Sequence, residues 1–102
     1  MTTIKMKEWV EGGFAGNKDL ASKIKADEII PALNRGEDVI IDFEQVNSAT
    51  QSFVHALISE VIRNFGIDVL DKISFKNCNP VVKWIINIVV DYMQDFRQNN
   101  EQ

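Results

Sequence analysis

Few side chains of this sequence could take part in catalysis or hold a metal. The chain has one histidine, His55, and one cysteine, Cys78, so they cannot supply a metal-ligand cluster or an internal disulfide. Asp42 and Glu44 lie two residues apart and would point to the same side of a strand. A carboxylate pair that moves protons needs a cleft and a partner. We therefore expect Asp42 to accept backbone N–H bonds at its strand end, and we predict no catalytic residue, metal or cofactor.

The single histidine and the single cysteine have simple structural interpretations. His55 lies at the edge of the apolar stripe of a predicted helix, where a packed or half-solvated imidazole is more common than a general base. Cys78 comes just before a helix start, where the helix dipole would lower the pKa of the thiol. A lone cysteine is typical of the reducing cytoplasm, and the first residues lack the apolar run of a secretion signal. We predict a cytoplasmic protein that is not an enzyme.

Size and composition indicate one small globular domain. The chain has 102 residues, of which 45% are hydrophobic and 25% are charged, with a formal net charge of −4. We expect the domain to span residues 1–97, followed by a polar flexible tail at 98–102. The lysines and arginines are scattered, which argues against nucleic-acid binding. No apolar run approaches the length of a membrane span.

The first part of the chain predicts a strand and a glycine-containing loop. Residues 3–10 alternate, with Ile4 and Met6 on one side, as a half-exposed strand does. Gly12 and Gly13 interrupt this pattern and match no nucleotide-binding fingerprint, so we interpret them as turn glycines. A short hairpin strand within residues 10–15 remains an alternative.

The next segment predicts a helix with a defect. Asn17 is the expected cap of a helix over residues 18–35, which Gly36 would end. The apolar stripe changes phase in its second half, and Pro31 lacks the N–H that a continuous helix needs. We expect a kink or break between about Asp27 and Pro31.

The rest of the chain predicts two more strands and two more helices. Residues 39–43 are apolar throughout, which is typical of a central strand with cover on both faces. Residues 52–65 have a regular apolar helix stripe, and residues 72–77 alternate like an edge strand. Asn79 and Pro80 form a cap and first turn for a helix that ends near Arg97. The predicted core consists of Ile41, Phe43, Val54, Leu57, Ile58, Val61, Ile85 and Val89.

This order predicts a small α/β fold, β-α-β-α-β-α, with a short, mostly parallel sheet and residues 39–43 as its central strand. The last helix is unusual because its apolar side covers roughly 200° of arc, about twice what a surface helix needs. Either this helix is wedged deep in its own domain, or part of it, Trp84 or Ile86 with Val90, meets another protein. A second copy of the chain is one such partner.

The loop between the central strand and the second helix contains the other candidate site residues: Asn47, Ser48, Thr50, Gln51, Ser52 and His55. Loops at the carboxyl ends of central strands are where open α/β sheets place their binding surfaces. Thr50 or Ser52 could cap the helix or could accept a phosphate, and capping is the more common role of such residues.

The same segment resembles the STAS domain, which is named after sulfate transporters and anti-sigma factor antagonists. The similarity is greater to a bacterial STAS-like family of unknown function. It rests on Ile41-Asp42-Phe43, Val46, residues 48–53, and the segment Asn77-Cys78-Asn79-Pro80-Val81-Val82. It covers roughly residues 12–96 and implies a STAS-like layered fold.

The resemblance also implies a function. STAS modules are non-catalytic, and anti-sigma factor antagonists bind a histidine-kinase-like ATPase that phosphorylates their loop serine. Gln51 stands at the position of that serine and cannot be phosphorylated, so Thr50 and Ser52 are the neighbouring candidates. The resemblance therefore implies a protein-interaction module of a bacterial regulatory or signalling switch. The alternative is a small-ligand or nucleotide-binding regulatory domain that uses the loops at residues 12–17 and 47–51.

Overall fold

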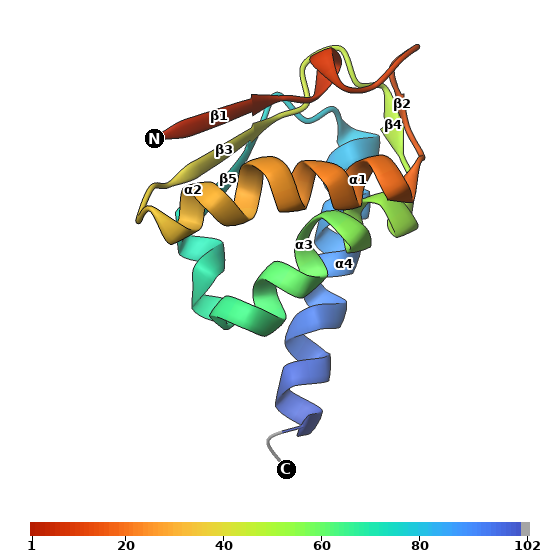
Figure 1. Ribbon diagram of the computed structural model, residues 1–102. Helices are drawn as coiled ribbons and strands as arrows, with labels where there is room; N and C mark the ends of the chain where they lie inside the picture. Colours follow the sequence, from red (N-terminus) through yellow and green to blue (C-terminus); the bar gives the residue numbers. More distant parts are fainter. Residues whose placement is uncertain (101–102) are drawn as a thin grey trace.

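The fold is a three-stranded parallel sheet with helices packed on one side (Figure 1). This computed structural model describes the backbone of residues 1–100 and the side chains of residues 1–94. The strands are β1 (Thr2–Lys5), β2 (Phe14–Ala15), β3 (Val39–Asp42), β4 (Ser48–Ala49) and β5 (Ile73–Lys76). The helices are α1 (Lys18–Ile24), α2 (Ile30–Asn34), α3 (Gln51–Phe65) and α4 (Pro80–Asn100), and short 3-10 turns span Met6–Glu8 and Ile67–Lys72. The predicted tail at 98–102 lies largely outside the part of the chain described in full.

The main sheet has the order β1-β3-β5, so β3 is its central strand as the sequence predicts. Both neighbours are parallel to it, with Ile41 opposite Ile4 on one side and Phe75 on the other. Parallel neighbours need crossover connections, and here the crossovers carry the helices. The mixed α/β fold class is therefore confirmed.

The prediction that both faces of the central strand are covered is wrong. Val39, Ile41 and Phe43 are buried, whereas Ile40 and Asp42 between them are only partly buried. The outer strands show why: their side chains beside Ile40 and Asp42 are Thr3, Lys5, Ser74 and Lys76, all exposed. A single apolar strand between two amphipathic strands has one core face, and its neighbours decide which face that is.

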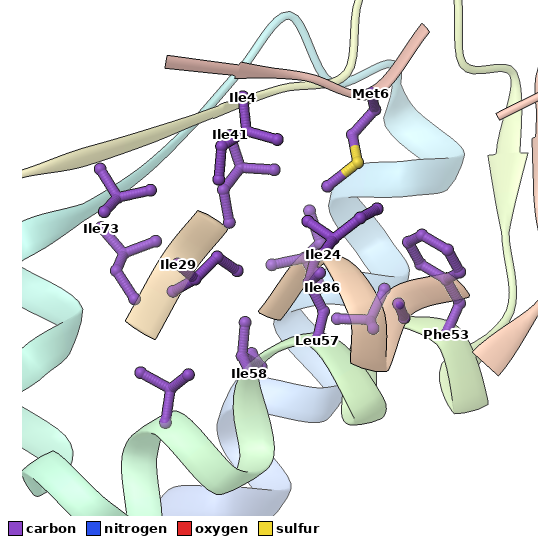
Figure 2. Close-up of a cluster of buried hydrophobic side chains, with 14 of the residues drawn as sticks. Ile4, Met6, Ile24, Ile29, Ile41, Phe53, Leu57, Ile58, Ile73 and Ile86 are labelled. Carbon is purple, nitrogen blue, oxygen red and sulfur yellow. The ribbon is translucent and has the colours of Figure 1, made fainter. Parts of the chain in front are cut away.

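The core lies between this face and the helices. Figure 2 shows Ile4, Ile41 and Ile73 of the sheet pointing toward Ile29 and Ile58 on the helices. Seven of the eight predicted core residues are buried, and Ile85 is partly buried against the core. Phe53 and Met93 are also buried in this cluster. Such burial of large side chains is the main stabilising contribution to a domain of this size.

The predicted strand over residues 3–10 ends early. Its last paired residue is Lys5, opposite Asp42, where β3 itself ends. Without a partner strand the backbone turns, and the N–H groups of Trp9 and Val10 both donate to the carbonyl of Met6. The burial of Ile4 and Met6 still follows the predicted alternation.

The predicted defect in the first helical region is a π-helical segment over Lys25–Ile29 that joins α1 to α2. Here the Ile30 N–H donates to the Lys25 carbonyl, five residues back. The wider turn places Ile24 and Ile29, five residues apart, on the same buried face. Pro31 then falls in the first turn of α2, where its missing N–H costs little. The α-helical pattern is interrupted as expected, but the chain does not break.

Candidate interaction surface

Two loops that are distant in the sequence form a second, two-stranded sheet beside the carboxyl end of β3. β2 pairs in parallel with β4, so that Ala15 lies opposite Ala49. The Asn47 N–H donates to the Gly13 carbonyl at 2.7 Å, and the Thr50 N–H donates to the Ala15 carbonyl at 3.0 Å. This parallel pairing was missed at the sequence level, where a strand within residues 10–15 appeared only as a hairpin alternative. Two-residue strands carry no periodicity that could reveal them.

Gly13 suits the left-handed backbone at the point where the two loops approach each other. Its φ is +73°, and a Cβ at this position would lie 2.8 Å from the Asn47 side-chain nitrogen. Gly13 presents its carbonyl to the neighbouring loop, where it accepts from the N–H groups of Asn47 and Ser48. A phosphate-binding loop instead presents free N–H groups. The interpretation of these glycines as turn residues fits this geometry better than a phosphate loop does.

Thr50 caps α3. Its hydroxyl oxygen accepts the Phe53 N–H at 3.0 Å, and its backbone is extended, as an N-cap requires. The next two residues, Gln51 and Ser52, begin the helix and are exposed. Ser48 is partly buried in β4, while Asn47 is exposed beside it. The capping role of Thr50 leaves Ser52 as the hydroxyl at this helix end that makes no capping hydrogen bond.

Asn79 connects this loop to α4. Its side-chain carbonyl accepts the Val82 N–H at 2.8 Å, which is the predicted cap. Its side-chain amide donates to the Asn47 backbone carbonyl at 2.7 Å. One residue therefore fixes the start of α4 and the loop before α3 relative to each other.

Asp42 has the predicted structural role. Its carboxylate accepts the Glu44 backbone N–H and the Asn77 side-chain amide, each at 2.9 Å. These bonds, the Asn77 amide first, hold the pKa of Asp42 below its usual value. The Glu44 carboxylate instead pairs with Lys7 at 2.7 Å. The two carboxylates thus have separate partners, and the lowered pKa of Asp42 is the opposite of what a general acid needs.

A groove between α3 and α4 brings several of the predicted site residues together. We call it the α3–α4 groove, and its volume is about 530 Å³. It is lined by Gln51, Ser52, His55 and Ala56 of α3, by Ile88, Val89 and Tyr92 of α4, and by Lys18 at the start of α1. The rings of His55 and Tyr92 lie 6.3 Å apart in a tilted arrangement. One end of the groove is therefore polar and the rest apolar.

The exposed apolar side of α4 differs from the predicted one. Trp84 is 63% exposed, but Ile86 is only 5% exposed and belongs to the core, and Val90 is partly buried. The exposed side instead includes Val81, Trp84 and Tyr92, with Ile88 partly exposed between them. A wide apolar arc does not show by itself which part faces the core, because that depends on where α3 and the sheet lie.

The pKa of the Cys78 thiol is shifted in the direction opposite to the expected one. The thiol is partly buried, and this burial raises its pKa, which outweighs the opposing effect of Lys83. A raised pKa makes the thiol less reactive. Among the described residues, no three carboxylate, imidazole or thiol groups lie together as a metal site would require. In the same part of the chain, no helix has the length and apolar character needed to cross a membrane.

Comparison with known families agrees with this architecture. Residues 21–83, more than half of the chain, match a family described as a STAS-like domain of unknown function (DUF4325). The chain belongs to this family. The match includes β3, β4, α3, β5 and the cap of α4, and so the α3 side of the groove but not Ile88, Val89 and Tyr92 of α4. No curated protein and no solved structure gives a significant match.

Proposed function

We propose that this STAS-like domain is a non-catalytic protein-interaction module of a regulatory switch, similar to anti-sigma factor antagonists. Its partner surface would be the amino end of α3 together with the α3–α4 groove. The observation that carries the proposal is that Gln51, Ser52 and His55 line one groove with the partly exposed Ile88 and the exposed Tyr92 of α4. An exposed apolar surface bordered by polar groups is typical of a protein-binding site.

The potentially reactive side chains outside this groove have structural roles or low reactivity, which supports a binding role for the domain. Asp42 and Asn79 hold the loops in place, and burial raises the pKa of Cys78. The loop N–H groups of Asn47, Ser48 and Thr50 bond to the neighbouring loop. These bonds favour a preformed protein-binding surface rather than a phosphate-binding loop. A preformed surface loses little entropy when a partner binds.

A switch at this surface would act through Ser52. Thr50 uses its hydroxyl to cap α3, and Gln51 cannot accept a phosphate. A phosphate on Ser52 would add nearly two negative charges inside the proposed interface. Negative charge in the first turn of a helix favours the helix itself. The modification would therefore change partner binding without unfolding the domain.

Site-specific cross-linking tests the proposal. A photo-reactive amino acid at Ser52 should form a covalent bond with one defined protein in cells that make this chain. The matched control is the same amino acid at Ser74, which is exposed on the uncovered face of the sheet. Capture of the same protein at both positions, or of none at Ser52, would contradict the proposed surface. A cross-link only between two copies of this chain would likewise contradict a foreign partner at this surface.

A further inference from the structure

The α3–α4 groove has a positive charge at its edge and no negative one to balance it. Among the described residues that line the groove, Lys18 is the only lysine, arginine, aspartate or glutamate. The acidic residues that are sequence neighbours of lining residues, Asp19 and Asp91, are not part of the lining. The groove therefore presents a positive charge in a chain whose formal net charge is −4.

The ammonium group of Lys18 is not used inside the chain. Several other cationic side chains form salt bridges with carboxylates: Lys7, Lys23, Lys25 and Arg35. Within the part of the chain whose side chains are described, Lys18 is exposed and forms no such pair. Helix stability does not explain this residue either, because α1 begins at Lys18 and a cation in the first turn opposes the helix dipole. An unpaired lysine is ordinary on an open surface, but this one borders a groove and is available to a ligand there.

The two-stranded sheet places Lys18 at the same end of the groove as the start of α3. The Thr50 N–H donates to the Ala15 carbonyl at 3.0 Å. The chain therefore leaves this sheet twice at neighbouring points, and α1 begins three residues after Ala15 while α3 begins directly after Thr50. Lys18 thus joins Gln51 and Ser52 as the polar end of the groove.

The remaining lining is apolar and open to solvent. Ala56 of α3 lies opposite Ile88 and Val89 of α4, and Tyr92, also of α4, is 56% exposed. Pockets for small molecules bury most of the surface of their ligand, which a groove with such exposed walls does not do. A helix of a larger protein suits a groove between two helices better, because its apolar face enters the groove while its outer face stays in water.

We propose that the α3–α4 groove binds an acidic amphipathic helix of the partner protein. The apolar face of this helix packs on Ile88, Val89 and Tyr92, and an aspartate or glutamate at its edge pairs with Lys18. This inference rests on the proposed function and names the chemistry of the partner. It also gives the switch a physical basis: a phosphate on Ser52 lies at the same end of the groove, where it repels the partner's carboxylate and competes with it for Lys18.

A pair of synthetic helical peptides tests the charge preference. Both carry leucines along one face; the acidic probe has glutamates at one edge of that face, and the basic probe has lysines at the same positions. In NMR titrations of the isotope-labelled chain, the acidic probe should bind about fivefold more tightly or better and should shift the amide signals of Ser52, His55 and Tyr92. The net charge of −4 alone would favour the basic probe. Equal affinities, preference for the basic probe, or no binding of the acidic probe at about 1 mM would overturn the proposal.

Lys18→Glu assigns the preference to one side chain. It should bind the acidic probe about fivefold more weakly or worse with an unchanged circular dichroism spectrum, because a negative residue in the first turn suits α1. Lys72→Glu is the matched control, since Lys72 is also exposed but lies in the turn beyond the far end of α3, and it should bind as the wild type does. Equal effects of the two variants would refute the pairing with Lys18. A protein captured at Ser52 together with equal affinity for the two probes would refute only this inference, whereas charge-selective probe binding without any captured protein would refute only the proposed function.

Discussion

Asn79→Ala should destabilise the domain through two lost hydrogen bonds. The Asn79 side chain caps α4 by accepting the Val82 N–H, and it donates to the Asn47 carbonyl in the loop before α3. Loss of an N-cap costs about 0.5–2 kcal/mol, and loss of a further hydrogen bond costs about 0.5–1.5 kcal/mol. Because the two bonds use different atoms, we expect the free energy of unfolding to fall by about 1–3.5 kcal/mol.

Asn79→Ser separates the two contributions. Serine caps helices as well as asparagine does, but its shorter side chain cannot reach the Asn47 carbonyl. The free energy of unfolding of Asn79→Ser should therefore fall by only about 0.5–1.5 kcal/mol. Urea denaturation measures both variants, and the slope with denaturant should be unchanged. Hydrogen exchange at the Val82 amide gives a local readout, with protection lost in Asn79→Ala and kept in Asn79→Ser. Equal losses in the two variants, with unchanged exchange at Val82, would refute this reasoning.

Three further changes test other parts of the structure. Leu57→Ala should lower the free energy of unfolding by about 2–5 kcal/mol, because Leu57 is fully buried, and a loss below about 1 kcal/mol in urea would contradict its place in the core. Gly13→Ala should be destabilising because of its positive φ and the close contact with Asn47, and a melting temperature equal to wild type would be inconsistent with that contact. The Glu37 pKa is lowered from 4.5 to about 2, chiefly by its hydrogen bond from Arg35. The stability that Glu37 contributes should therefore be complete above pH 4.5 and disappear as the pH falls toward 2. The difference in stability between wild type and Glu37→Gln, measured against pH, should shrink in that range, and a constant difference would contradict the lowered pKa.

The elements that the sequence predicts well are those with strong local signals. The apolar stripe from Val54 to Ile62 and the run at 39–43 each identify an element without help from the rest of the chain. Asn17 and Asn79 cap their helices as predicted, because a cap depends on residues within one turn. These signals also place the central strand and the loop that follows it.

The features that the sequence does not predict depend on contacts between distant segments. The end of β1 is set by where β3 ends, and β2 exists only through its pairing with β4. The phase change near Pro31 predicts a defect, but only packing on the core distinguishes a π-helical turn from a break. Ile86 is buried and Trp84 exposed because of where α3 lies against α4. The α3 residues of the candidate site could therefore be predicted largely from the sequence. The α4 residues that face it could be identified only from the structure.

The central claim is that the amino end of α3 is the partner surface, and one binding measurement tests it most directly. The affinity of the partner cross-linked at Ser52 is measured for wild type, Ser52→Ala, Ser52→Glu and the control Ser74→Glu. Ser52→Glu should weaken binding by about tenfold or more, because it places a charge inside the interface, while Ser52→Ala and Ser74→Glu should bind nearly as the wild type does. Wild-type affinity for Ser52→Glu, with the fold intact by circular dichroism, would contradict the account.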